Sequence, residues 1–349
     1  MPSAADDIRA AIAAHGGSIP FHRFMEIALY GEHGFYATSG SAGRRGDFIT
    51  SSEVGPLFGA VIARALDAWW HEMGQPNGFT VVEAGAGPGT LARAILAAAP
   101  RCLESGSYIA VEVSDAQRQL HPSGIESRPD LPDRPITGVV LANELLDNLP
   151  FDLAVFDGAW REAHVAADRD RFVEVLVPMD EVRDFLPANP PHGARAPIQT
   201  GVRNWLRQAA EILEDGRILL FDYCTPVTAQ AALSPWREWL RTYVGHERGG
   251  HYLLRPGEQD ITNQVMIDQL SRVVEPEAVR TQAQFLQLWG IDELVDEGRR
   301  VWEANAARPD LAAMKMRSRI SEADALLDPS GLGAFSALTF RIDRRLRSS

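Results

Sequence analysis

Short apolar runs alternate with amphipathic stretches through the middle of the chain. Each run is continuous rather than alternating, which is typical of strands buried on both faces of a sheet. The stretches between them repeat apolar residues at the spacing of one helix face. This alternation predicts a parallel sheet covered by helices. The expected strands are residues 79–82, 108–113, 138–142 and 217–221, and the expected helices are residues 56–73, 90–99 and 202–213.

The N-terminal part of the chain carries a different pattern. Residues 8–15 are predicted to form a short helix that Gly16 and Gly17 end, and Ser18 is placed to cap a second helix. A glycine-rich loop over residues 31–46 follows. We therefore expect a helical segment and a loop ahead of the sheet.

Two further regions depart from the alternation of strands and helices. Residues 152–157, 160–167 and 172–177 alternate apolar and polar positions around turn residues, which predicts an antiparallel insertion. Residues 226–325 are expected to be mostly helical and irregular, and residues 335–342 to form a final strand. Within the late region, Trp236, Trp239 and Tyr243 recur at helical spacing, which favours a buried helix face.

These patterns together predict a division of the chain into domains. The expected parts are a helical N-terminal segment with a covering loop over residues 1–76, a sheet core over residues 77–225 and 331–345 with a β insertion at about 151–180, and a mostly helical insertion over residues 226–330.

Charge and cysteine content narrow the functional classes. The formal net charge of −13 disfavours general binding to nucleic acid, because an acidic surface repels phosphates. Cys102 and Cys224 are far apart in sequence, so neither a disulfide framework nor a metal site is expected. We see no secretory signal and no apolar run long enough to span a membrane, and therefore expect a cytoplasmic protein without membrane insertion.

The strongest local signal is a glycine-rich turn between a strand and a helix. Glycines at 85, 87 and 89 lack a Cβ, so the backbone of this turn can approach a ligand closely. The spacing G-x-G-x-G differs from the dinucleotide fingerprint G-x-G-x-x-G. Pro88 also removes one N–H donor, which makes a pyrophosphate site less suitable. A ligand made of adenosine and an amino acid needs no pyrophosphate site, so the turn is compatible with such a ligand. The structural alternative is a tight turn that binds no ligand.

An acidic residue ends the next expected strand. Glu112 lies 23 residues after Gly89, close to the offset of about 20 at which dinucleotide-binding sheets place a ribose-binding carboxylate. A carboxylate there can accept hydrogen bonds from both ribose hydroxyls. Taken alone, Glu112 is equally well a solvated acid at a strand end. Together with the turn, it is a candidate ligand contact.

Polar residues also follow the strand of residues 138–142. Asn143, Glu144 and Asp147 come just after its carboxyl end, where open α/β sheets hold their substrates. The alternative is structural, with Asn143 capping a helix and Asp147 solvated. We treat Asn143 and Glu144 as candidates for contact with the reacting groups, and we call this end of the sheet the reaction edge.

At this point the chain resembles a known family, the MidA-like methyltransferases, which include the mitochondrial complex I assembly arginine methyltransferase. The similar motifs occur in the same order along nearly the whole chain. They are residues 24–30 with 34–36, residues 46–53 with the sequence GDFITSSE followed by residues 58–59, residues 82–91 with VEAGAGPGTL, residues 143–150 with NELLDNLP, residues 256–262 and residues 281–286.

The resemblance implies a fold, a cofactor and a reaction. The fold is an α/β, Rossmann-like class I methyltransferase sheet, and the cofactor is S-adenosylmethionine. The reaction is methylation of an arginine in a protein, with a respiratory complex I subunit as the suggested substrate. The implied cofactor-binding residues are Asp47, Thr50, Glu83, Gly85, Gly87, Gly89, Glu112 and Asn143, and the implied catalytic carboxylates are Glu53, Glu144 and Asp147.

Arginine is a demanding nucleophile because its guanidinium is protonated at neutral pH, with a pKa above about 12. Carboxylates can orient its planar donors and accept a proton as transfer proceeds. Two other functions remain open from the sequence. One is a cofactor-binding assembly factor without turnover, and the other is an NAD-dependent enzyme on a similar sheet.

Overall fold

The computed structural model describes residues 2–38, 50–245 and 247–344. The chain forms two compact units, each built from several segments. We call them the sheet unit and the insertion unit and describe each separately. The sheet unit comprises residues 49–144, 208–222 and 276–349, and the insertion unit comprises residues 1–48, 145–207 and 223–275.

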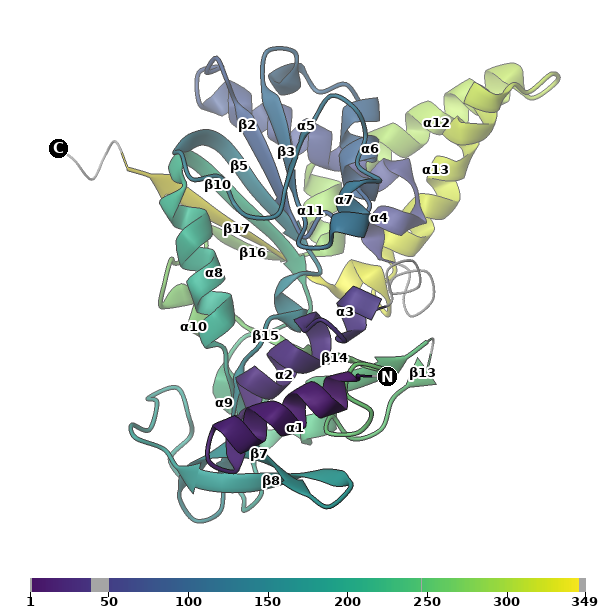
Figure 1. Ribbon diagram of the computed structural model, residues 1–349. Coiled ribbons are helices and arrows are strands. Elements are labelled where there is room, and N and C mark those ends of the chain that lie inside the picture. The colour runs from purple at the N-terminus through teal and green to yellow at the C-terminus, as the bar shows by residue number, and fades with distance from the viewer. Residues whose placement is uncertain (1, 39–49, 246, 345–349) are drawn as a thin grey trace. The chain divides into compact units, whose positions relative to one another are not determined.

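The sheet unit is built on a seven-stranded sheet (Figure 1). Its five strands from β10 to β4 pair in parallel, whereas β17 is antiparallel to β10 and β16 is antiparallel to β17. In spatial order the strands are β16 (Ala278–Thr281), β17 (Ser336–Asp343), β10 (Leu213–Asp222), β5 (Ile136–Asn143), β2 (Thr80–Ala84), β3 (Ser107–Val111) and β4 (Glu126–Arg128).

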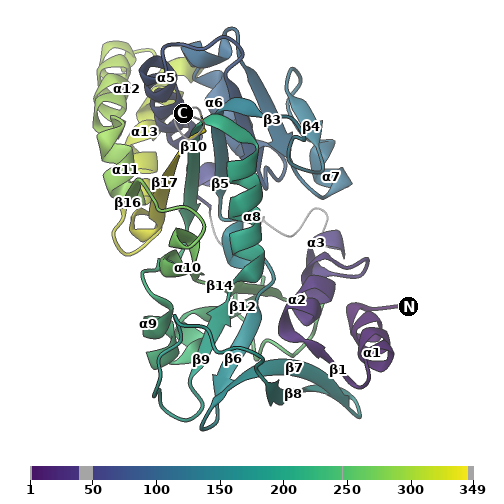
Figure 2. The ribbon, with the colours of Figure 1, turned by 90° about the vertical axis from the view of Figure 1, so that its left-hand side faces the viewer.

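Helices cover one face of this sheet (Figure 2). Buried apolar side chains of these helices and of the strands form a continuous core between them. Phe58 of the long helix α5 packs edge-on against Phe221 of β10, and Phe285 of α11 packs on the same ring. α12 and α13 form an antiparallel pair that extends away from the sheet (Figure 1). The helices are α4 (Ser51–Val54), α5 (Pro56–Glu72), α6 (Thr90–Ala97), α7 (Asp115–Arg118), α11 (Gln282–Leu288), α12 (Ile291–Asn305) and α13 (Leu311–Leu327).

The three central strands approach closely at a pair of glycines. Gly138 of β5 lies opposite both Thr80 of β2 and Gly216 of β10. A Cβ on Gly138 would lie 1.9 Å from the carbonyl oxygen of Thr80, and one on Gly216 would lie 1.8 Å from that of Gly138. Because both contacts are with backbone, no side-chain rotation relieves them.

We therefore expect Gly138→Ala to destabilise the protein by about 3 kcal/mol or more, which corresponds to a fall in melting temperature of at least about 6–12 °C. Gly78→Ala is the matched control, because Gly78 has a φ of +75° and a Cβ at that position would have no atom within 4 Å. The control should show only the cost of the left-handed backbone, about 1–2 kcal/mol. Equal losses in thermal melts of both variants would show that strand crowding is unimportant.

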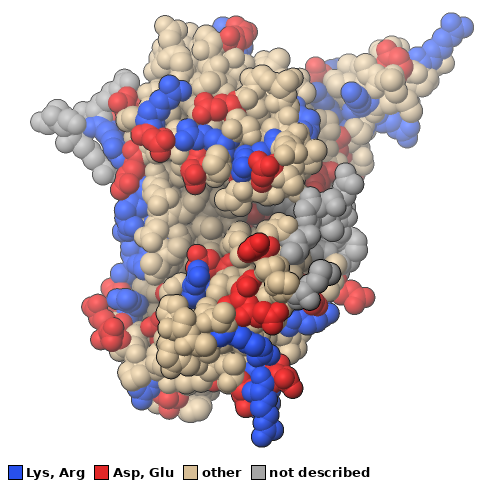
Figure 3. Space-filling model, viewed as in Figure 1, with Lys and Arg blue, Asp and Glu red and all other residues tan. Residues whose placement is uncertain are grey.

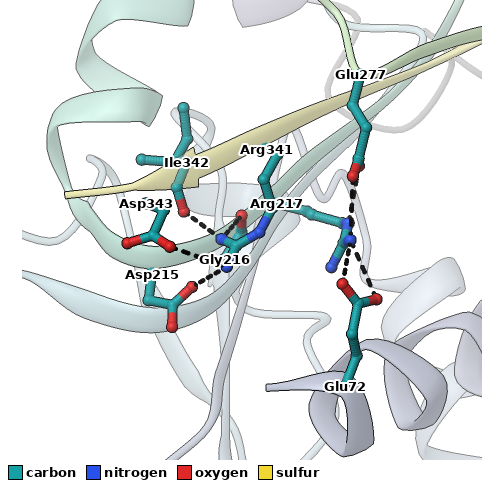
Figure 4. Close-up of polar contacts among 8 residues, drawn as sticks. All are labelled: Glu72, Asp215, Gly216, Arg217, Glu277, Arg341, Ile342 and Asp343. Atoms are coloured by element: carbon teal, nitrogen blue, oxygen red, sulfur yellow. Dashed lines mark hydrogen bonds and ion pairs between the residues drawn. The ribbon is translucent and has the colours of Figure 1, made fainter. Parts of the chain in front are cut away.

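An ion-pair network with a buried cation lies near the middle of β10 (Figure 4). Arg217 is 5% exposed, and its Nε and Nη2 atoms donate to Glu277 and Glu72 over 2.8–3.1 Å. Its guanidinium also lies over the ring of Trp69, 5.4 Å from the ring centre. The two carboxylates differ from Arg217 in reaching water, with side chains that are 58% and 39% exposed.

This asymmetry predicts unequal effects of removing the two charges. Arg217→Met leaves two acids that are already hydrated, so we expect the free energy of unfolding to fall by less than about 2 kcal/mol. Replacing both Glu72 and Glu277 by Ala leaves a buried cation without an anion, and we expect a loss of about 3–5 kcal/mol. Urea denaturation measures the free energy of unfolding of both variants. A larger fall for Arg217→Met than for the double variant would contradict this account.

The insertion unit is organised around a five-stranded antiparallel sheet (Figure 2). The N-terminal helices pack against it, with Ile8, Ile12 and Phe24 in the same core as Leu153 and Val165. Its elements are α1 (Ala4–Ala14), β1 (Ser18–Pro20), α2 (Phe21–Tyr30), α3 (Phe35–Thr38), β6 (Asp152–Phe156), β7 (Trp160–Asp168), β8 (Arg171–Pro178), β9 (Arg195–Ile198), β11 (Cys224–Thr225), α9 (Thr228–Leu233), β12 (Leu240–Val244), β13 (Glu247–Arg248), β14 (Asp260–Asn263), β15 (Val265–Met266) and α10 (Ile267–Ser271). The helix α8 (Thr200–Glu211) carries the chain from this unit back to the sheet unit.

The expected α/β fold class and the parallel sheet are confirmed, as is the antiparallel insertion. The predicted cap at Ser18 is wrong, because Ser18 begins β1, which pairs with β7, and α2 starts at Phe21. The late region also contains the strands β12 to β16, so it is less helical than expected. The compact units divide the chain at other points than the expected domains, because the N-terminal helices pack on the insertion.

Across the face shown in Figure 3, Arg and Lys side chains are interspersed with Asp and Glu. No helix within the described ranges is long and apolar enough to cross a membrane.

Candidate functional site

The carboxyl ends of β2, β5 and β3 meet at one edge of the sheet unit, because these strands pair in parallel. Each delivers a candidate residue to that edge. The glycine turn follows β2, Glu112 follows β3, and Asn143 is the last residue of β5. Sequence reasoning therefore selected residues that the fold brings to the same edge.

The turn after β2 adopts a backbone that needs glycine. Gly85, Gly87 and Gly89 have φ values of 68°, 54° and 79°, in the left-handed region that most side chains avoid. At Gly89 a Cβ would also lie 3.0 Å from Pro122 and 3.3 Å from His121. The turn can therefore come close to a ligand, and a side chain at Gly89 would be strained by its backbone conformation and crowded by these two neighbours.

The turn has few N–H groups left for an anionic ligand. The N–H of Ala86 donates to the carbonyl of Val111 over 3.0 Å, and that of Gly89 donates to Ala86 over 2.9 Å. Gly87 donates to Glu112, and Pro88 has no N–H. Residues 86–89 therefore offer no free donor to a pyrophosphate, which argues against a dinucleotide.

Glu112 lies against the turn, with each of its oxygens held by the main chain. Oε2 accepts a hydrogen bond from Gly87 N over 2.9 Å, and Oε1 accepts one from Ser114 N over 2.9 Å. Each carboxylate oxygen can accept more than one hydrogen bond, so both still have capacity for a hydroxyl. Val113, the next residue, is 68% exposed and adds an exposed apolar side chain just after this strand.

Glu83 lies deeper in the sheet, where it is 4% exposed. Tyr108 of the neighbouring strand donates its hydroxyl to Glu83 Oε2 over 2.7 Å. Burial and the adjacent Glu83 carboxylate raise the pKa of Tyr108 well above its ordinary value, so Tyr108 remains a donor. This places Glu83 beneath the turn, and its expected role as a direct cofactor ligand stays a prediction.

The end of β5 combines an amide, a carboxylate and an unusual backbone. Glu144 has a φ of 51°, which is uncommon for a residue other than glycine and is typical of functional sites. Its Oε1 accepts from Asn143 Nδ2 over 3.2 Å and from Ser51 N over 3.4 Å. Asn143 Oδ1 is buried and lacks a hydrogen-bond partner within the described part of the chain. This oxygen is therefore a candidate acceptor for a ligand N–H or O–H.

Ser51 belongs to the short helix α4, in the GDFITSSEVG motif. Its hydroxyl donates to Gln282 Oε1 over 2.7 Å, and Gln282 in turn donates to the carbonyl of Leu326. Two motifs that lie 231 residues apart thus meet to fix the helix that contacts Glu144. Ser51 and Gln282 were missed as site residues, although their place in separate motifs was a usable signal.

Thr50 and Glu53 form a cap at the start of α4. Glu53 Oε2 accepts a hydrogen bond from Thr50 N over 3.2 Å, and Thr50 Oγ1 pairs with Ser52 Oγ over 3.0 Å. Glu53 is exposed. The structure thus gives Glu53 a local structural contact near Ser51, and the expected roles of Thr50 and Glu53 toward cofactor and substrate stay predictions.

Asp147 and Asp47 are the two remaining predicted residues. Asp147 belongs to the insertion unit, where it is 6% exposed and its backbone oxygen accepts a hydrogen bond from Asn263 over 2.7 Å. Asp47 lies outside the described residues. The catalytic role expected for Asp147 stays a prediction.

The residues present fit the adenosine of a cofactor, and the occupied donors of the turn favour S-adenosylmethionine over a dinucleotide. Glu112 offers acceptors to ribose hydroxyls, Val113 offers apolar surface to an adenine ring, and Asn143 Oδ1 offers a buried acceptor. The glycine turn allows close approach while its own donors are occupied. Across residues 2–38, 50–245 and 247–344, no group of three or more His, Cys, Asp and Glu side chains is placed to hold a metal ion.

Comparison with known sequences points to the same cofactor. The model of a family of S-adenosyl-L-methionine-dependent methyltransferases matches residues 61–284. The chain is similar to the mitochondrial protein arginine methyltransferase NDUFAF7 of Mus musculus, with 26% identity over 331 residues that cover 79% of this chain and 72% of the mouse protein. It is 31% identical over 192 residues to the NDUFAF7 homolog of Drosophila melanogaster, a match that covers 46% of this chain and 44% of the fly protein. The match thus spans less than half of the fly protein's length.

Solved structures give a similar result. A Burkholderia thailandensis protein whose crystal structure contains S-adenosyl-homocysteine is similar with a TM-score of 0.81 and 26% identity. That similarity covers 97% of this chain and 91% of the bacterial one. A native crystal structure of a protein from the same organism gives a TM-score of 0.79.

Proposed function

The chain belongs to the family of S-adenosyl-L-methionine-dependent methyltransferases, and from this premise we propose that it methylates an arginine side chain of a protein. Its cofactor is S-adenosylmethionine. The arginine proposal draws on the names of the mouse and fly relatives and on a carboxylate at the reaction edge. The observation that carries the proposal is the position of Glu144, held beside Asn143 at the end of β5 with a strained backbone.

The cofactor supplies a methyl group on a positively charged sulfur, and much of the rate of such a transfer comes from positioning. Glu112 would hold the ribose hydroxyls, and the glycine turn would let the cofactor lie close to the main chain. Asn143 would offer its buried Oδ1 as an acceptor at the same edge.

Glu144 would act on the acceptor. A guanidinium carries a fixed positive charge and planar donors, which a carboxylate can orient through charge-assisted hydrogen bonds. The nitrogen that gains a methyl group must lose one proton, and Glu144 would take it on a carboxylate oxygen. Ser51 N and Asn143 Nδ2 hold that side chain in place beforehand.

The test is to identify the methylated product. The protein is incubated with S-adenosylmethionine carrying a heavy methyl group and with a lysate from cells that lack the protein. Peptide mass spectrometry then locates the label. We expect label on arginine in protein, and the resemblance to MidA-like methyltransferases makes respiratory complex I subunits the first acceptors to examine.

Label on a small molecule or on another side chain would overturn the arginine proposal. Cofactor binding and a stable protein complex without any labelled product would favour the alternative, an assembly factor that binds the cofactor without turnover.

A further inference from the structure

His121 contacts the glycine turn from a loop that leads back to the edge strand β4. Its Nε2 lies 2.9 Å from the carbonyl oxygen of Gly87, and its Nδ1 lies 2.8 Å from Ser127 Oγ on β4. A carbonyl oxygen only accepts, so Nε2 must carry the proton in this contact. In the tautomer that carries its proton on Nε2, Nδ1 accepts a hydrogen bond from the Ser127 hydroxyl.

The peptide groups of Gly87 are therefore held on two sides. Glu112 accepts from its N–H over 2.9 Å, and His121 donates to its carbonyl. The loop that carries His121 is itself anchored, because Arg93 of α6 donates to the carbonyl of Leu120 over 3.0 Å. His121 and Pro122 also crowd the position that a Cβ at Gly89 would take, at 3.3 and 3.0 Å.

We propose that His121 is a positioning residue of the cofactor site. By holding the carbonyl of Gly87 it restrains the backbone angles of this residue, and thereby the N–H that Gly87 donates to the Glu112 carboxylate. Glycine at position 87 restrains its backbone less than other residues do, so contacts with both of its peptide groups help to hold one conformation. The carboxylate that would hold the ribose is thereby oriented before the ligand arrives, so less side-chain conformational entropy is lost on binding. This inference rests on the cofactor site of the proposed function but not on the identity of the methyl acceptor.

The test is calorimetric titration with S-adenosylhomocysteine, which needs no acceptor. In His121→Asn the side-chain amide can stay near Ser127 but is too short to reach Gly87. We expect its dissociation constant to rise about 3- to 10-fold, the usual effect of one lost hydrogen bond. In His121→Gln the amide nitrogen lies as many bonds from the backbone as Nε2, so we expect affinity within about 2-fold of the native protein.

A merely structural role makes a different prediction. If His121 only fills space, both variants should weaken binding alike, and their melting temperatures should fall together. Equal affinities for Asn and Gln variants, whether both native or both weak, would overturn the proposal.

A double-mutant cycle that combines His121→Asn with Glu112→Gln adds a second readout, again the affinity for S-adenosylhomocysteine. Because both side chains act on Gly87, the combined loss of affinity should be smaller than the product of the single losses. Fully multiplicative losses would show that His121 and Glu112 act independently, contrary to the proposal. A failure to find an arginine product, by contrast, would leave these binding results unaffected.

Discussion

Replacing Glu144 by Gln is expected to slow methyl transfer about 100-fold or more at saturating cofactor. Glutamine keeps the shape of the side chain and an oxygen that can accept from Ser51 N, but it cannot take a proton from a guanidinium. General bases typically contribute about 10²- to 10⁴-fold to a rate. The affinity for S-adenosylhomocysteine should change by less than about 3-fold, because the carboxylate is proposed to face the acceptor.

Glu214→Gln is the matched control for this measurement. Glu214 is an exposed glutamate near the start of β10, at the opposite end of the strand whose Phe221 pairs with Glu144 through the backbone. It should leave both turnover and affinity unchanged. Native turnover in Glu144→Gln would remove this residue as the proton acceptor, and Glu53 would become the next carboxylate to test.

Replacing Glu112 by Ala is expected to weaken S-adenosylhomocysteine binding by at least about 100-fold. A hydrogen bond to a charged group contributes about 1.5–3 kcal/mol, and two ribose hydroxyls would lose their acceptor together. The alanine variant also leaves Gly87 N and Ser114 N without their carboxylate. Glu112→Gln should lose less, since its single amide oxygen still accepts.

Glu104→Ala serves as the control, because Glu104 is exposed and precedes the same strand at its other end. Calorimetry and melting temperature should both be measured, so that a loss of affinity is separated from a loss of fold. Native affinity in Glu112→Ala would show that the ribose lies elsewhere.

The parallel sheet could be predicted because its central strands are buried on both faces. Val81, Val82, Val139 and Val140 are fully buried, which gives the continuous apolar runs seen in the sequence. The glycine turn, Glu112 and Asn143 could be predicted for a related reason, because parallel strands bring their carboxyl ends to one edge.

Contacts between distant segments could not be predicted in the same way. Ser18 has the composition of a helix cap, but pairing with β7 makes it the start of a strand. Trp239 and Tyr243 have helical spacing, yet residues 240–244 form β12, which pairs with β14. Tertiary pairing overrides local preference in both cases.

Contacts at the site and elsewhere in the sheet unit were also not predictable from the sequence. His121 is a single histidine in a polar loop, and nothing in its neighbourhood indicates a contact with Gly87. Glu322 is similar, since it accepts from Leu57 N at the start of α5 from 265 residues away. Such residues are recognised only when the chain is folded.

The central claim is that the turn of residues 85–89 and Glu112 together hold the nucleoside of the cofactor. A crystal structure of the protein with S-adenosylhomocysteine tests it most directly. We predict both ribose hydroxyls within hydrogen-bond distance, about 2.6–3.2 Å, of the Glu112 carboxylate. A nucleoside bound away from this turn, with Glu112 still bonded only to Gly87 and Ser114, would contradict the claim.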